Sequence, residues 1–230
     1  MWKLKNSDKI YEWKMTDYLD TIWSEIIEEL RQKKGTIRMR LLIVRHGDPD
    51  YSIDSLTEKG WKEAEYLSER LSKLDVKDFY VSPLGRAKDT ASFTLKKMNR
   101  TAVECDWLRE FDVLIDRPDV TDRQKRLWDW LPQDWTMDER FYQYDHWYEN
   151  ERLQQSDAKG YYDYVTGKFD KLLAEHGYVR EGHHYRVEKP NEDTLVFFCH
   201  FGLECVLLAH LIGASPMVLW HGFCAAPSSV

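Results

Sequence analysis

Two histidines and an arginine follow apolar runs at the points where strands should end. Arg45 and His46 come directly after residues 41–44 (LLIV), and His200 follows residues 194–199. Short continuous apolar runs are typical of strands buried on both faces of a parallel sheet. In open α/β sheets, ligands gather at the carboxyl ends of the strands, where helix N-termini offer free N–H groups to anions. Although a single strand-end histidine is more often structural, their joint placement predicts an anion site with a nucleophile or proton carrier.

The spacing of apolar residues predicts the elements that position this site. Strands are expected at 41–44, 79–81, 103–105 and 194–199, and helices at 58–73, 84–98 and 202–212, the last ended by Gly213. The inner face of the first helix should carry Trp61, Ala64, Leu67 and Leu71. Residues 185–199 are interpreted as a hairpin with a turn at 190–193. Strands that alternate with amphipathic helices indicate an α/β fold with a mostly parallel central sheet flanked by helices.

The first 38 residues are expected to form an N-terminal helical extension. Thr16 can cap an amphipathic helix over about 17–33, and Gly35 is a stop signal. Its apolar residues fall on one helical face: Leu19, Ile22, Trp23, Ile26, Ile27 and Leu30. This face either packs on the chain's own domain or binds another subunit or a partner, and a homodimer is one of these alternatives.

Composition excludes several classes of protein. The 230 residues carry a net charge of −7, whereas a general nucleic-acid or membrane-surface binder would show a basic excess. A hydrophobic content of 43% argues against disorder, and no apolar run approaches the roughly 20 residues that span a bilayer. The four cysteines are sparse and lack CxxC spacing, which favours reduced thiols in a cytoplasmic protein.

Six motifs follow one another along residues 39–230. They are Arg45-His46-Gly47, Leu56-Thr57-x-x-Gly60, Ser82-Pro83-x-x-Arg86-Ala87-x-x-Thr90-Ala91, Leu108-Arg109-Glu110, Cys199-His200-Phe201-Gly202 and Pro227-Ser228-Ser229-Val230. In this order they resemble the motifs of the histidine phosphatase superfamily, the phosphoglycerate-mutase-like proteins. The resemblance implies a catalytic domain over 39–230.

The resemblance assigns roles to the histidines and arginines of these motifs. His46 would attack phosphorus as a neutral imidazole and form a phosphohistidine that water hydrolyses. Arg45 and Arg86 would hold the phosphoryl oxygens, for which the planar guanidinium is suited. His200 would complete the phosphate pocket and stabilise charge on the transferring group.

The general acid implied by the resemblance is Glu110, which would protonate the leaving oxygen and then activate water. Asp112 and Asp116 are close in the sequence, and either could serve instead. Such a pocket needs no metal and no cofactor. The expected partner is a small-molecule phosphate ester rather than a nucleic acid or a membrane.

Other phosphate chemistries fit the sequence less well. No cysteine is followed six residues later by arginine, so a cysteine-based phosphatase is excluded. A GxxxxGK[ST] loop and a GxSxG elbow are absent as well. Phosphoglycerate mutase activity is the nearest rival, but residues 48–51 (DPDY) replace the family's mutase pattern after Arg-His-Gly. A weakly active regulatory module that binds phosphate is the third interpretation.

Residues 128–164 contain eleven aromatic side chains and lie in an expected cap insert over about 120–165. In the family that the chain resembles, the segment between the acid and the second histidine caps the active site. The aromatics therefore predict a lid for a ring-bearing or bulky ester. Ordinary packing of a helical subdomain is an equally weighted interpretation.

Overall fold

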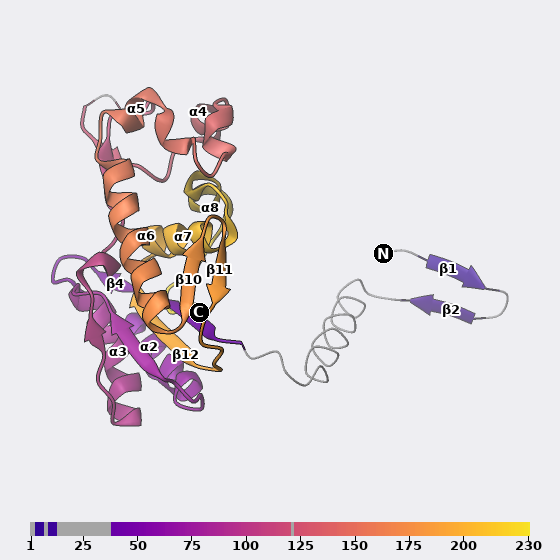
Figure 1. The fold of residues 1–230 in the computed structure, drawn as a ribbon, viewed down its shortest axis with the longest axis vertical. Helices are drawn as coiled ribbons and strands as arrows, with labels where there is room; N and C mark the ends of the chain where they lie inside the picture. The colour runs from indigo at the N-terminus through magenta and orange to yellow at the C-terminus, as the bar shows by residue number, and fades with distance from the viewer. Residues whose placement is uncertain (1–2, 7–8, 13–37, 121) are drawn as a thin grey trace. The chain divides into compact units, whose positions relative to one another are not determined.

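In a computed structural model of the chain, residues 3–6, 9–12, 38–120 and 122–230 are described. The chain divides into two units, Met1–Arg38 and Met39–Val230, and each is described by itself (Figure 1). In the first unit, β1 (Lys3–Asn6) pairs antiparallel with β2 (Lys9–Glu12). The helix predicted over 17–33 lies outside the described residues.

A four-stranded parallel sheet forms the centre of the second unit. Its strand order is β3 (Arg40–Arg45), β12 (Thr194–Cys199), β6 (Asp78–Val81) and β7 (Val103–Glu104). All three neighbouring pairs are parallel. These strands confirm the predicted α/β fold with a parallel central sheet.

Helices cover both faces of this sheet (Figure 1). On one face, Val196 and Phe198 of β12 share a core cluster with residues of α2 (Glu58–Leu71) and α3 (Gly85–Met98). On the other face, Leu195 and Phe197 pack in a cluster with α6 (Ala158–Glu175) and α7 (Phe201–Ile212). Because its side chains alternate between two apolar layers, β12 is buried along its whole length.

The hairpin expected over 185–199 is wrong. His184–Val187 (β11) pairs antiparallel with Tyr178–Glu181 (β10), and β12 instead lies between two parallel neighbours. Gly182, with a φ of +58°, supplies the left-handed backbone of the short β10–β11 turn. The apolar character of β12 on both faces requires a central position that a two-stranded hairpin does not offer.

One residue of the predicted helix faces is also misplaced. Trp61 is 37% exposed and contacts Phe93 edge to face, whereas Ala64, Leu67 and Leu71 are buried as expected. Its neighbour Gly60 occupies the inward position instead. A Cβ on Gly60 would lie 2.2 Å from the Asp48 carbonyl oxygen, so the chain approaches too closely there for a side chain.

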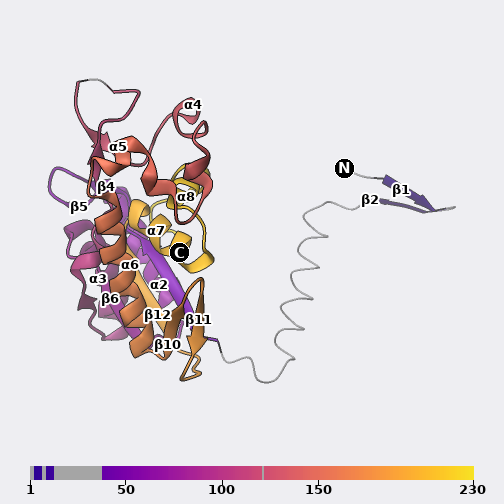
Figure 2. The same ribbon diagram turned by 45° about the horizontal axis from the view of Figure 1, so that its top comes forward.

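The segment between the second arginine motif and β12 contains mostly short elements. It includes η1 (Asp106–Leu108), β8 (Leu114–Ile115), β9 (Lys125–Arg126), α4 (Pro132–Trp135), η2 (Glu139–Tyr142), η3 (Trp147–Glu149) and α5 (Glu151–Gln154). A small hairpin, β4 (Pro49–Asp50) with β5 (Ser55–Leu56), follows β3. The cap helices α4 and α5 lie at the end of the unit toward which β3 runs (Figure 2). The last helix is α8 (Pro216–Gly222).

Several cap aromatics belong to the core of the unit. Trp130, Phe141, Trp147 and Tyr162 are buried and join the cluster that covers one face of the sheet. These four therefore pack the helical subdomain. Trp128 is only partly buried, and it contacts Phe201, the residue directly after His200.

Replacing Trp147 by alanine should destabilise the fold without removing a group of the candidate site. The indole is fully buried and contacts Tyr162 and Trp220. Truncating a buried Trp costs about 3–5 kcal/mol of unfolding free energy. The free energy can be measured by urea unfolding, with the exposed Tyr164→Ala as the matched aromatic control, expected within about 0.5 kcal/mol of wild type. Equal loss in both variants would contradict the assignment.

Candidate active site

The parallel pairing of β3 with β12 brings the two histidines together. Cys199 is the register partner of Arg45, so His46 and His200 both follow directly at the same sheet edge. The His46 N–H donates to the Cys199 carbonyl oxygen at 3.0 Å, and the two imidazole centroids are 5.1 Å apart. The sheet register thus explains why residues 154 positions apart form one site.

The imidazole of His46 is held in a defined orientation. Its Nδ1 lies 2.7 Å from the Gly47 carbonyl oxygen, and because a carbonyl can only accept, Nδ1 carries the proton. The other ring nitrogen, Nε2, is therefore the one that carries a lone pair. His46 is 1% exposed, and this burial lowers its pKa to about 4, aided by Arg86 and Arg45 and opposed by the Gly47 bond. The His46 ring is thus uncharged at neutral pH, with a lone pair on Nε2.

The titration of His46 is directly measurable. A pKa of about 4, below the ordinary 6.5, means that the ring stays uncharged until the solution is well below pH 5. We expect its imidazole carbon protons to shift in an NMR titration with a midpoint near pH 4, a signal assigned by its loss in His46→Ala. A midpoint near 6.5 would contradict the burial argument.

Among the described residues, three buried nitrogens near His46 have no hydrogen-bond partner. They are Arg45 Nε, Arg86 Nε and His200 Nδ1. Leaving a buried donor unpaired costs about 1–3 kcal/mol, so such groups call for a partner. The two arginine nitrogens are donors, and Nδ1 of the neutral His200 ring is a donor when Nε2 accepts from the Ser82 hydroxyl. In that tautomer, an anion with several acceptor oxygens would satisfy all three together.

Each of these residues is fixed by contacts through its other atoms. Arg45 donates from Nη1 to the Ala225 carbonyl oxygen, and Arg86, in the first turn of α3, donates from Nη1 to Asp54 at 2.5 Å. His200 Nε2 lies 2.8 Å from the Ser82 hydroxyl. Burial lowers the pKa of His200 well below its ordinary value, with Arg86 the next largest cause, so this ring is also neutral.

Glu110 approaches the same edge of the sheet from the loop after η1. Its Oε1 accepts hydrogen bonds from the backbone N–H of Phe111 at 2.9 Å and of Leu203 at 3.2 Å. Leu203 is in the first turn of α7, directly after His200, so the carboxyl satisfies one of the free N–H groups of that helix. Glu110 is 8% exposed, whereas the alternatives Asp112 and Asp116 are exposed.

Burial makes the Glu110 carboxyl group a weaker acid than an ordinary carboxylic acid. Desolvation raises its pKa, and this outweighs the opposing hydrogen bonds from Phe111 and Leu203 and the charges of Arg86 and Arg126. A carboxyl group with a raised pKa is suited to donate a proton near neutral pH. Of these three carboxyl groups, that of Glu110 is the buried one at this edge of the sheet.

The structure adds residues to the site that the sequence did not indicate. Asp54 pairs with Arg86, and its backbone φ of +49° is unusual for a residue other than glycine. A Cβ on Gly202 would lie 2.8 Å from Glu110 Oε1 and 2.7 Å from Trp128 Nε1, so glycine is needed for this approach. Ser82 lies within a motif, which was the one available signal for its contact with His200.

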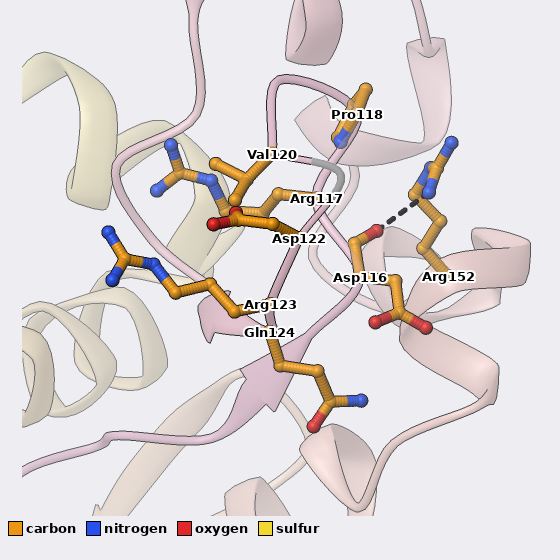
Figure 3. Close-up of a pocket in the computed structure, with 8 residues that line it drawn as sticks. All are labelled: Asp116, Arg117, Pro118, Val120, Asp122, Arg123, Gln124 and Arg152. Atoms are coloured by element: carbon orange, nitrogen blue, oxygen red, sulfur yellow. Dashed lines mark hydrogen bonds between the residues drawn. The ribbon is translucent and has the colours of Figure 1, made fainter.

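A cavity of about 470 Å³ in the cap lies among residues outside this group (Figure 3). Two of its arginines are already paired, since Arg117 binds Asp119 and Arg152 donates to the Asp116 carbonyl oxygen at 2.7 Å. Mixed charges of this kind do not make an anion site. Within the described residues, no group of three or more His, Cys, Asp or Glu could hold a metal ion.

The family to which the chain belongs follows from the comparison of its sequence with known families. The sequence model of the histidine phosphatase superfamily (branch 1) matches residues 41–160, which is half of the chain, and the chain belongs to this superfamily. The match includes His46, Arg86 and Glu110. The resemblance inferred from the motifs is thereby confirmed.

Curated relatives match shorter segments. A 2,3-bisphosphoglycerate-dependent phosphoglycerate mutase of Thermoplasma acidophilum is 35% identical over 72 residues, covering 27% of this chain and 36% of the relative. The mitochondrial serine/threonine-protein phosphatase Pgam5 of Drosophila yakuba is 33% identical over 102 residues, covering 40% of this chain and 35% of the relative. The chain thus aligns with about a third of the length of each.

Solved structures share the fold over most of the second unit. A mycobacterial hydrolase matches with a TM-score of 0.53 and 20% identity, covering 82% of this chain and 88% of that one. A mycobacterial glucosyl-3-phosphoglycerate phosphatase in complex with VO3 matches with a TM-score of 0.51 and 21% identity, covering 83% and 88%. At these identities the likeness establishes the fold alone. Among the described residues, no helix is long and apolar enough to cross a membrane.

Proposed function

We propose that this chain is a metal-independent phosphatase that hydrolyses a small phosphate monoester through a phosphohistidine on His46. The observation that carries the proposal is the set of unpaired buried nitrogens on Arg45, Arg86 and His200 around a neutral imidazole. A phosphoryl group offers acceptor oxygens to those nitrogens and a phosphorus atom to the imidazole. Membership of the superfamily and its phosphatase and mutase relatives support the same chemistry.

In the first step, the lone pair of His46 Nε2 attacks phosphorus, and the bond from phosphorus to the ester oxygen breaks. Arg45, Arg86 and His200 hold the phosphoryl oxygens, where charge-assisted hydrogen bonds are strong. The departing oxygen takes the proton of the Glu110 carboxyl group and leaves as an alcohol. The Gly47 carbonyl oxygen, as acceptor from Nδ1, stabilises the positive charge that develops on the ring.

In the second step, water replaces the alcohol. The Glu110 carboxylate accepts a proton from water as the water oxygen attacks phosphorus, and the bond between nitrogen and phosphorus breaks. Inorganic phosphate leaves, His46 regains its lone pair and Glu110 is again protonated.

All four cysteines are free thiols, which supports a reducing compartment, and we propose the cytoplasm.

A phosphate-release screen over a panel of phosphorylated metabolites tests this function. We expect hydrolysis of at least one small monoester, unchanged by a chelator. The same reactions, followed for isomerisation of phosphoglycerates, separate a phosphatase from a mutase. No release from any ester, or release that stops with the chelator, would contradict the proposal.

A further inference from the structure

The side chain of Trp128 occupies a fixed place beside the proposed acid. Its indole N–H donates to the Phe111 carbonyl oxygen at 2.8 Å, and its backbone carbonyl accepts from Arg117. Trp128 Nε1 and Glu110 Oε1 flank the same point on Gly202. Because the acid must reach the leaving oxygen, the alcohol part of the substrate has to lie on the Glu110 side of the site, where Trp128 is also placed.

Cationic and aromatic side chains contact one another in a row from Arg45 to the exposed Arg126. The guanidinium of Arg45 lies 5.4 Å from the Phe201 ring centroid, and Phe201 meets Trp128 edge to face with centroids 5.9 Å apart. The guanidinium of Arg126 then lies 5.4 Å from the Trp128 ring. Arg126 is thus the cation at the far end of a row of contacting side chains that begins at Arg45.

Arg126 is available to bind an anion. It is exposed on β9. Of the acidic residues nearby in sequence, Asp119 and Asp129 lie within ion-pair distance of Arg117, and the exposed Asp122 is in none of the ion pairs among the described residues. Stacking on an indole that is itself hydrogen-bonded restricts the guanidinium, which lowers the entropy cost of binding. The charge of Arg126 also acts on Glu110, as expected for a group close to the acid.

We propose that Arg126, stacked on Trp128, recognises a second anionic group on the alcohol part of the substrate. Trp128 and Phe201 supply the flat apolar surface between the two ends. The substrate class is therefore an aromatic phosphate monoester whose ring carries a carboxylate or similar anion. This inference rests on the proposed function for the position of the leaving group.

Ligands that differ by one carboxylate test the proposal. Phenylphosphonate and 4-carboxyphenylphosphonate cannot be hydrolysed, so calorimetry measures their binding independently of turnover. In wild type we expect the carboxylated ligand to bind roughly tenfold more tightly, as one charge-assisted contact allows. In Arg126→Gln this preference should vanish, while the affinity for phenylphosphonate stays unchanged, and Arg126→Lys should restore part of it.

A matched control and a kinetic arm complete the test. Arg123→Gln removes another exposed arginine of the same β8–β9 segment and should keep the preference. With phenyl phosphate and 4-carboxyphenyl phosphate as substrates, Arg126→Gln should raise KM for the carboxylated ester alone. The proposal is overturned if wild type shows no preference, or if Arg126→Gln weakens both phosphonates equally. If the phosphonate preference is present but neither these two esters nor any ester of the metabolite panel is hydrolysed, the recognition site stands and the proposed hydrolysis fails.

Discussion

Replacing His46 by alanine is expected to reduce kcat at least about 10³-fold on every phosphate monoester that the wild-type chain hydrolyses. The imidazole is buried, neutral and oriented by the Gly47 carbonyl oxygen. His221 is held in a similar way by the Met217 carbonyl oxygen, but its Nε2 already accepts from the Trp130 N–H. His200, the other ring at the site, uses Nε2 for its contact with Ser82. Initial rates of phosphate release measure the loss.

His46→Asn separates the loss of the nucleophile from a loss of folding. Its amide can donate to the Gly47 carbonyl oxygen as the imidazole does, but it offers no nitrogen lone pair to phosphorus. Both variants should unfold cooperatively, and both should fail to gain a phosphoryl group in an alkaline-quenched reaction analysed by mass spectrometry. His184→Ala, at an exposed position of β11, serves as the control with full activity. Wild-type rates in His46→Ala would exclude the phosphohistidine mechanism.

The sheet and the meeting of the two histidines could be predicted because they depend on local patterns. Residues 41–44 and 194–199 are apolar runs, which are typical of parallel strands covered by helices on both faces, and parallel strands place their carboxyl ends at one edge. The hairpin predicted over 185–199 is wrong because local patterns do not specify which strands pair. Turn signals at 190–193 indicated a connection but not which strand Tyr185 would pair with, and β10 begins just after a helix that ends at Glu175.

The contacts that complete the site could not be derived from local patterns. Asp54 and Arg86 form an ion pair although they are 32 residues apart, and Trp128 of the cap contacts Phe201 at the start of α7. Helices of four residues, such as α4 and α5, are too short to show a helical period in the sequence. Such contacts depend on how the cap packs. The sequence therefore indicated that the cap is rich in aromatic residues, but not which of them lies near Glu110.

Replacing Glu110 by glutamine should slow the reaction in proportion to how much the leaving group needs a proton. An alkyl alcohol is a poor leaving group, so the rate of phosphoryl transfer to His46 should fall by about 10²–10⁴ on an alkyl phosphate. The p-nitrophenolate leaves without protonation, and transfer from its ester should change much less. Single-turnover measurements isolate this step from the later attack by water. Equal losses on both esters would show that the glutamine variant disturbs phosphate binding instead.

The pH dependence gives the same residue a second signature. Because burial raises the pKa of Glu110, the carboxyl keeps its proton on the acidic side of that raised pKa and loses it as the pH increases through it. Transfer from an alkyl ester should therefore decline on the alkaline limb in wild type, and the decline should disappear in Glu110→Gln. Asp112→Asn, at an exposed neighbouring position, should retain the limb. If Asp112→Asn removes the limb and Glu110→Gln keeps it, the acid is Asp112, and the hydrogen bonds of Glu110 to Phe111 and Leu203 serve to fix the start of α7.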